Sequence, residues 1–283
     1  MKITNYLRLG FTTFLLLSVL SGCATVIPVE RGIGTLNLKN EQWPKLKPDK
    51  KVIAIVSPSF ANTQKQRQLP PSITQNPFLQ MAAGIAPSRF NFNDAFSTNY
   101  SDRVSRAIET SVSEMVSSKG FKLKGPYSVF DDITYQDKKT IYLALVPKFD
   151  LIIDDRETNR KNHRLYQHSE GVIQVGGSVT VSLLEPMTGQ VFVKRRINLS
   201  DFGIKESYIR EKQISNGGAS IFDILIDKST APKKLIDTTD VALANAMNEF
   251  YSKAIVKINS YLDKEEMLSF KSDISKLKNL KRF

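Results

Sequence analysis

The sequence is poor in the residues from which most catalytic and metal sites are built. Its 283 residues include one cysteine, two histidines and one tryptophan. His163 and His168 have no thiol or obvious third ligand near them in the sequence, and zinc requires three or four ligands. The G-x-S-x-G elbow of serine hydrolases and the glycine-rich loops that hold phosphate groups are absent as well. We therefore expect a protein without enzymatic activity, a metal or a bound cofactor.

The lone cysteine closes a short hydrophobic leader. Residues 11–20 are apolar, basic residues precede them, and the leader ends in Leu20-Ser21-Gly22-Cys23, a bacterial lipobox. An apolar run of this length is too short to span a bilayer and is typical of a secretory signal peptide. The sequence predicts removal of residues 1–22 and attachment of a diacylglycerol and an N-acyl chain to Cys23, which anchors the chain in a membrane. The alternative is an ordinary signal peptide followed by an unmodified cysteine.

Lipidation of Cys23 has consequences for the fold and for the location. It uses the only thiol, so no disulfide can form within the mature chain and the core alone must hold the fold. Residue 24 is alanine rather than aspartate, which favours the outer membrane under the sorting rule of enteric bacteria. We expect an outer-membrane lipoprotein that faces either the periplasm or the outside.

The charge of the chain indicates what kind of partner it meets. The formal net charge is +12 at pH 7, which favours anionic neighbours such as lipopolysaccharide, sialylated glycans or acidic envelope polymers. Nucleic acid is a weaker candidate, because an exported chain does not reside in the cytoplasm. The alternative is that the positive charge only keeps the surface soluble.

The pattern along the mature chain predicts one domain. We expect a lipidated tether at 23–32 and a single globular domain at 33–283. Within this domain, residues 61–93 are rich in proline, glutamine and asparagine. A loop of this length is uncommon in a compact domain, so we interpret it as an insertion.

Hydrophobic periodicity predicts an α/β fold. Apolar residues recur every three or four positions between Asp94 and Lys119, which indicates one long helix after the buried strand Lys51–Val56. Further strands are expected at 121–129, 141–153, 171–184 and 190–199. We expect bulges at Pro147 and at Gly176-Gly177, and a hairpin turn at 185–189.

Two apolar stripes, at 238–261 and from Asp263 onward, predict paired C-terminal helices. The fold class is therefore a mixed, mainly antiparallel sheet with one long helix after the first core strand and two C-terminal helices. The stripe on the last helix favours packing within the chain, with a homodimer through the C-terminal helices as the alternative.

Three segments together resemble a known family. They are the lipobox, the helix YSDRVSRAIETSVSEMVSSKGFKL at 100–123, and the stretch from VTVSLLEPMTG to INLSDFGIKE at 179–206. They are similar to the neuraminyllactose-binding hemagglutinin lipoproteins of helicobacters, also called Helicobacter adhesin A. The similarity runs from about residue 51 to the C-terminus and keeps the order of the elements.

This resemblance implies a lipoprotein of the cell surface or flagellar sheath that adheres to sialylated host glycans. The family's proposed glycan-binding stretch, rich in lysine, arginine and threonine, matches the basic segment 156–164. The candidate residues are Arg156, Thr158, Asn159, Arg160, Lys161 and Arg164. An arginine fork can pair with the carboxylate of sialic acid, a lysine adds a point charge, and threonine and asparagine can bond sugar hydroxyls. The alternative is a solvated basic loop without a ligand.

Two functional hypotheses follow. The first is an adhesin-type binding protein on the outer membrane that contacts anionic glycans. The second is a periplasm-facing structural or assembly lipoprotein of the envelope or flagellum.

Overall fold

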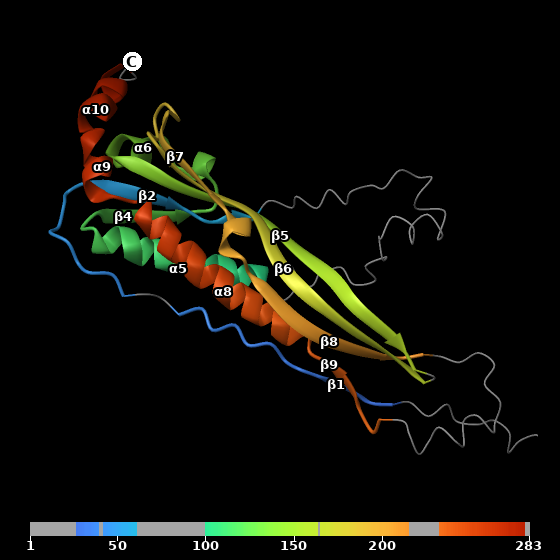
Figure 1. Ribbon diagram of the computed structural model, residues 1–283. Helices are drawn as coiled ribbons and strands as arrows, with labels where there is room; N and C mark the ends of the chain where they lie inside the picture. Colours follow the sequence, from blue (N-terminus) through green and yellow to red (C-terminus); the bar gives the residue numbers. More distant parts are fainter. Residues whose placement is uncertain (1–26, 40–41, 61–99, 164, 215–231, 281–283) are drawn as a thin grey trace, which may run out of the picture.

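A long, curved sheet forms the body of the molecule, with its main helices on one side (Figure 1). The computed structural model describes residues 27–39, 42–60, 100–163, 165–214 and 232–280. Nine strands form the sheet in the order β1-β9-β8-β6-β5-β2-β4, with β3 paired to β5 and β7 paired to β6. Pairs around β6 are antiparallel, whereas β2 is parallel to both of its neighbours. The predicted fold class is confirmed.

The elements have the following bounds. The strands are β1 (Val29–Arg31), β2 (Val52–Val56), β3 (Ser59–Phe60), β4 (Lys122–Tyr127), β5 (Leu143–Asn162), β6 (Tyr166–Leu184), β7 (Val191–Asn198), β8 (Lys205–Gln213) and β9 (Leu235–Asp237). The helices are α5 (Ser101–Ser118), α6 (Tyr135–Thr140), α8 (Thr239–Ser260), α9 (Lys264–Ser269) and α10 (Lys271–Leu280), with short 3-10 turns η1 (Phe130–Asp132) and η2 (Leu199–Phe202).

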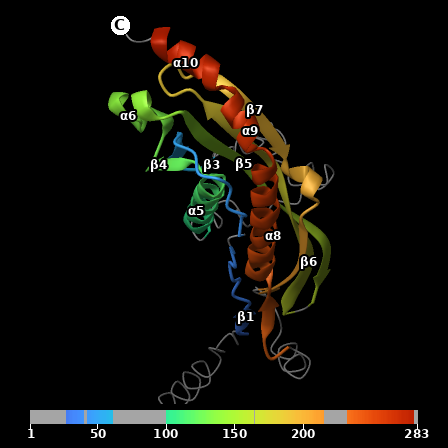
Figure 2. The same ribbon diagram turned by 90° about the vertical axis from the view of Figure 1, so that its left-hand side faces the viewer.

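Helices α5 and α8 bury their apolar stripes under the sheet, and Figure 2 shows α8 running along the length of the molecule beside α5. The core side chains of these two helices include Val104, Ile108, Val112, Met115, Leu243, Met247, Phe250 and Ile258. Both helices were predicted from the sequence. The first was expected to start at Asp94, but residues 94–99, like the insertion 61–93, lie outside the described residues. Within the described part of the chain, no helix is long and apolar enough to cross a bilayer.

The second C-terminal helix differs from its prediction. It is divided into α9 and α10 at Phe270. At the start of α9, the Asp263 carboxylate caps the helix by accepting a hydrogen bond from the Glu266 N–H at 2.8 Å. Its apolar residues Met267 and Ile274 are buried in the core of the same chain. The stripe therefore packs within the chain, and the homodimer stays a prediction.

The longest feature is the hairpin of β5 and β6, which pair from Ala144–Leu184 to Asn162–Gln167. On its other edge β6 pairs first with β8 and then, after Gly176-Gly177, with β7. The bulge expected at these glycines is wrong, because the register with β5 is continuous there. Gly177 instead adopts φ 95°, and a Cβ atom built on it would lie 1.9 Å from the Asp150 carbonyl oxygen.

The bulge expected at Pro147 is also wrong. Pro147 lies opposite Val181 in a continuous ladder, and the register of β5 and β6 shifts between Glu157 and Asn159 instead. On the other edge of β5, pairing with β2 ends at Leu145 and pairing with β3 resumes at Lys148. Proline is tolerated here because it falls in this gap, where no neighbouring strand needs its missing N–H.

The predicted hairpin turn is confirmed, and a buried carboxylate organises it. Glu185 is fully buried. Its carboxylate accepts hydrogen bonds from the backbone N–H of Met187 at 3.0 Å and from the N–H and hydroxyl of Thr188 at 2.7 and 2.8 Å. These three bonds compensate the carboxylate for the loss of water. The Glu-Pro-Met-Thr-Gly motif is thus a structural turn.

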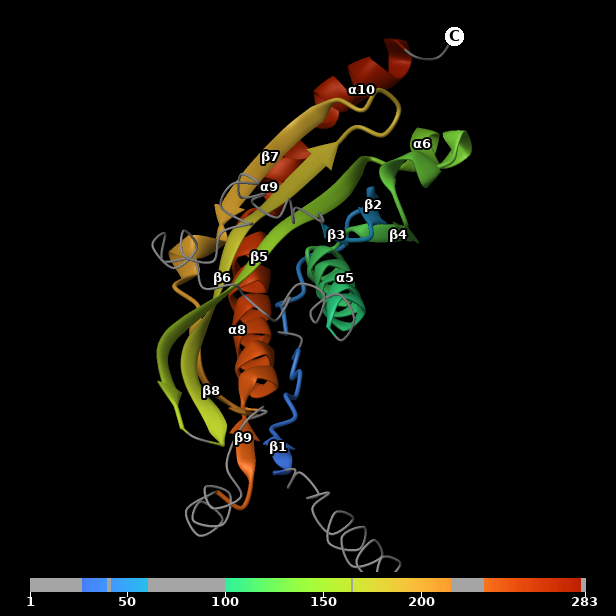
Figure 3. The same cartoon turned by 90° about the vertical axis from the view of Figure 1, so that its right-hand side faces the viewer.

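The N-terminal segment is attached to the fold rather than loosely tethered. Strand β1, which falls within the expected tether, pairs in parallel with β9. The Gly32 N–H donates to the Asp237 carbonyl at 2.9 Å, and the Gly34 N–H donates to the Asp240 carboxylate at 2.8 Å. From there the chain runs beside α8 (Figure 3). The fold therefore begins no later than Ile27.

Candidate functional site

The basic segment predicted to bind glycans is the end of a strand, not a loop. Residues 156–162 belong to β5 and pair with β6, and the turn of the hairpin starts at His163, whose N–H donates to the Tyr166 carbonyl at 2.9 Å. The polar composition of this segment suggested a loop. Backbone pairing with β6 makes it a strand, because ladder hydrogen bonds do not depend on side-chain polarity. Arg164 lies outside the described residues.

The pleat divides the predicted residues between two faces of the hairpin. Arg156, Asn159 and Lys161 lie opposite Val172, Glu170 and His168 of β6, on what we call the outer face. Arg160 lies opposite the buried Ser169 on the other side, which we call the inner face because it is turned toward α8. Thr158 sits at the register shift, and its hydroxyl donates to the Glu170 carbonyl at 3.2 Å. The five described candidates thus do not converge on a single pocket.

Nearby carboxylates already hold part of the predicted set. The Arg160 guanidinium donates twice to Glu157, with one bond of 2.8 Å. The Asn159 amide donates to the Glu170 carboxylate at 3.3 Å. Such pairing occupies the groups that a glycan carboxylate or hydroxyl would need.

Two cations of the predicted set, Arg156 and Lys161, are more accessible to a ligand than Arg160. The Arg156 side chain is 72% exposed, and the nearest carboxylate oxygen, of Asp154, is 4.0 Å from its guanidinium. Lys161 is exposed, and no carboxylate of the described residues forms an ion pair with it. These two side chains share the outer face and form the candidate anion-binding surface.

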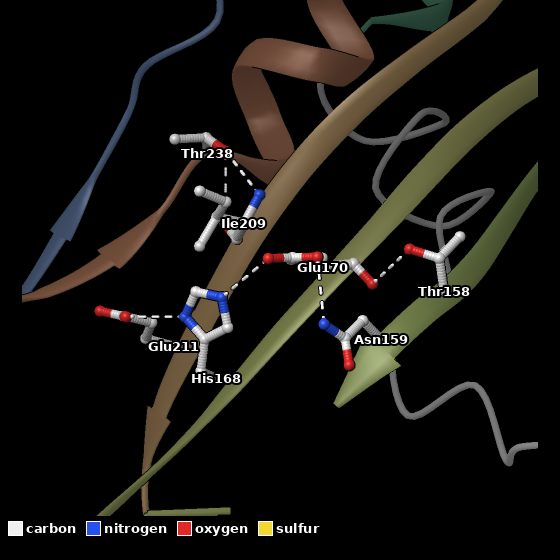
Figure 4. A network of polar contacts seen from close by, with 7 residues as sticks. All are labelled: Thr158, Asn159, His168, Glu170, Ile209, Glu211 and Thr238. Carbon is white, nitrogen blue, oxygen red and sulfur yellow. Dashed lines mark hydrogen bonds and ion pairs between the residues drawn. The ribbon is translucent and has the colours of Figure 1, made fainter. Parts of the chain in front are cut away.

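A polar network that the sequence did not predict lies around His168 on the outer face (Figure 4). His168 lies opposite Lys161 of β5. His168 Nδ1 lies 2.9 Å from a carboxylate oxygen of Glu211, and Nε2 lies 3.4 Å from one of Glu170. The charged ring can donate a hydrogen bond to each carboxylate. Glu211 also accepts from the Ile236 N–H at 2.9 Å, so the network links β6, β8 and β9. His163 is separate, with its ring stacked on Tyr166 at a centroid distance of 4.4 Å.

The network makes the stability of this end of the sheet depend on pH. The hydrogen bond to Glu211 raises the pKa of His168 above its ordinary 6.5, although burial opposes the rise. Because the pKa of His168 is higher in the folded than in the unfolded protein, the protonated ring stabilises the fold fully below pH 6.5. This stabilisation is lost as the pH rises through the folded-state pKa of His168. We expect the free energy of unfolding to fall by up to about 1 kcal/mol across this window, the scale of one partly exposed ion pair.

Urea unfolding at a series of pH values, compared between the wild type and His168→Gln, measures this dependence. The difference in unfolding free energy between the two proteins should shrink as pH rises. A difference that stays constant with pH would contradict the assignment.

The inner face holds a second cluster that sequence reasoning missed. The Asp155 carboxylate accepts a hydrogen bond from the Tyr208 hydroxyl and pairs with Arg210 at 3.3 Å. The Arg210 and Asp155 side chains are only 11% and 8% exposed. Arg210 also donates to the Thr239 hydroxyl at 3.2 Å, at the start of α8. Burial, followed by the bond to Asp155, raises the pKa of Tyr208. This cluster fastens β8 and α8 to β5.

Gly171 makes this connection possible. It lies on β6 between Tyr208 and the β5 strand, and a Cβ atom there would be 2.3 Å from the Tyr208 ring. Asp154 and Asp155 point to opposite faces, because successive residues of a strand alternate between its two sides. No sequence signal pairs Asp155 with residues more than fifty positions away, so only the fold reveals the cluster.

An open groove with a volume of about 1080 Å³ lies between residues 42–48 and the C-terminal end of α5. Its lining includes Trp43, Glu114, Ser117 and Phe121. The Trp43 indole N–H is buried and has no acceptor among the described residues. None of the five described glycan-binding candidates lines this groove.

Comparison with known proteins identifies the family to which this chain is similar. The sequence profile of a family described as neuraminyllactose-binding hemagglutinin precursor matches residues 18–281. A neuraminyllactose-binding hemagglutinin of Helicobacter pylori strain J99 is 24% identical over 200 residues, which cover 67% of this chain and 74% of the relative. The protein of that name from strain 26695 is 23% identical over 199 residues, with the same coverage of both chains.

A solved structure shows the same fold. The crystal structure of a neuraminyllactose-binding hemagglutinin homologue from Helicobacter pylori superposes with a TM-score of 0.50. The match covers 85% of this chain and 98% of the other, at 14% sequence identity. At that identity the likeness concerns the architecture only.

Proposed function

The chain belongs to the neuraminyllactose-binding hemagglutinin family, and from this premise we propose that it is a lipid-anchored adhesin of the outer membrane that binds sialylated glycans. The protein has no catalytic role in this proposal, and its only covalent additions are the acyl chains on Cys23. The family match, which extends over almost the whole chain, carries the proposal. Cys23, the last residue of the lipobox, supports the anchor.

On the hairpin, Arg156 and Lys161 are the groups suited to the carboxylate of a sialic acid. They are exposed, lie on one face and are not held by a short bond to a carboxylate. Arg160 would have to leave Glu157 before it could bind a ligand. We propose that Arg156 supplies the contact to the sialic acid carboxylate.

Sialyllactose binding by arginine variants tests this assignment. Arg156→Ala should weaken binding about tenfold, the effect of one charge-assisted hydrogen-bonding group. Arg160→Ala should change it little. Arg196→Ala is the matched control, because Arg196 is an exposed arginine on β7. Binding is measured by calorimetry, with lactose as the uncharged comparison.

Two results would overturn the assignment. One is equal affinity for lactose and sialyllactose. The other is a loss in Arg196→Ala as large as the loss in Arg156→Ala.

The carboxylates beside the candidate residues favour a second candidate function. Glu157 and Glu170 engage Arg160 and Asn159, as expected of side chains that hold a scaffold together. We therefore also propose, as the alternative, a periplasm-facing structural or assembly lipoprotein of the envelope or flagellum. Protease treatment of intact cells separates the two: an adhesin is cleaved, and a periplasmic protein is cleaved only after the outer membrane is broken.

A further inference from the structure

The N-terminal end of the fold and the tip of the long hairpin lie at the same end of the molecule, as Figures 1, 2 and 3 agree. The Ile27 N–H donates to the Gln213 side chain at 3.0 Å. Gln213 lies opposite Tyr166, at the first rung of β6 after the hairpin turn. The next residue, Pro28, accepts a hydrogen bond from the Leu235 N–H at 2.9 Å. The chain therefore enters the fold beside the hairpin tip.

The length of chain before Ile27 limits where an anchor can be. Cys23 is four residues before Ile27, and a fully extended chain of that length reaches about 14 Å. Along β5, the distance from the hairpin tip to the other end of the sheet is about 60 Å, at about 3.3 Å per residue. Acyl chains on Cys23 can be close to the tip and cannot be close to α10 or the β6–β7 turn, which lie at the opposite end (Figure 3).

The side chains at the tip have the chemistry of a membrane surface contact. Lys161, Lys212 and Lys233 are exposed, and no carboxylate of the described residues forms an ion pair with them. The Tyr166 ring stacks on His163 at the turn itself. Lysines are attracted to anionic headgroups, and tyrosine is enriched where a membrane meets water.

We propose that the hairpin tip rests on the anionic phospholipid headgroups of the bilayer that holds the anchor. The molecule then stands on its hairpin, and α6, α10 and the β6–β7 turn point away from the membrane. This inference rests on the proposed lipidation of Cys23, and it places Lys161 at the membrane, which leaves Arg156, farther from the tip along β5, to contact a glycan. At about 1 kcal/mol per basic residue, Lys161 and Lys212 together favour contact of the tip with an anionic surface about thirtyfold.

Site-specific labels on the full lipidated protein test the orientation. Cys23 is the only cysteine, so once it is acylated an introduced cysteine is the single free thiol. A fluorophore is attached to Asn162→Cys at the tip or to Gln190→Cys at the far turn; both positions are exposed. The proteins are placed in phosphatidylglycerol-containing vesicles that carry a nitroxide on the lipid headgroup, which quenches nearby fluorophores.

We expect severalfold stronger quenching at Asn162 than at Gln190. In the Lys161→Gln, Lys212→Gln background, quenching at Asn162 should fall toward the value at Gln190. The matched control replaces Lys194 and Arg196, two exposed cations on β7, with glutamine and should leave quenching at Asn162 unchanged.

Vesicle flotation, performed first, distinguishes failure of the anchor from failure of the orientation. If the protein does not float with the vesicles, the anchor is absent and the inference falls with it. If the protein floats but Asn162 is quenched no more than Gln190, or if the control pair on β7 matters as much as the lysines, the orientation alone is wrong.

Discussion

Gly177→Ala is expected to lower the free energy of unfolding by about 3 kcal/mol or more, the sum of an unfavourable backbone conformation and a steric clash. Gly177 has φ 95°, which side-chain-bearing residues rarely adopt, and the added Cβ would lie 1.9 Å from a backbone oxygen. Neither strand can move away easily, because β6 is paired on both edges near this point. Thermal unfolding should show a decrease in Tm of about 10 °C for a domain of this size.

Gly176→Ala is the matched control for this change. A Cβ atom on Gly176 would meet only the Ser200 hydroxyl, at 3.6 Å, and its φ is not positive. Its Tm should therefore stay within a few degrees of the wild type. Similar decreases in Tm for Gly177→Ala and Gly176→Ala would contradict this prediction. They would show that the fold does not need the positive φ of Gly177 at the point where β6 changes partner strands.

Arg210→Met is expected to destabilise the protein by about 3 kcal/mol, since removing one partner of a buried ion pair leaves the other charge uncompensated. Asp155 would keep its bond to Tyr208 and remain largely buried. The double variant Asp155→Asn, Arg210→Met should be more stable than Arg210→Met alone, because no unpaired charge is left. Urea unfolding of the wild type, Arg210→Met and the double variant measures the three free energies of unfolding.

An exposed ion pair provides the comparison. Arg195 pairs with Glu266 at 3.0 Å, but their side chains are 51% and 36% exposed. Arg195→Met should therefore cost less than about 1 kcal/mol. If it costs as much as Arg210→Met, burial is not what makes the Asp155 cluster important.

Elements with a strong local signal were predictable from the sequence. The apolar stripes of α5 and α8 and the turn residues of the β6–β7 hairpin gave the right element types, because each depends on residues close together in the chain. The distal part of the β5–β6 hairpin was not predictable. Residues 156–162 carry charges and amides, and what makes them a strand is the partner strand β6, which periodicity does not identify.

The candidate site was predictable only in part, for a related reason. The resemblance to the family pointed to Arg156 and Lys161 as anion-binding candidates, but it could not show that Glu157 holds Arg160. It also could not place Asp155 beside Arg210, because that contact depends on the register of three strands. Charge pairing across a sheet is a property of the fold rather than of any one segment.

The pairing of β1 with β9 determines how the molecule responds to mechanical load. A pull on the N-terminus directed along β1 loads its pairing with β9 and, just after the strand, the hydrogen bond from Gly34 to the Asp240 side chain of α8. Such a pull shears these hydrogen bonds together instead of peeling them apart one by one. The N-terminal attachment therefore resists a pull along β1 better than a pull across it.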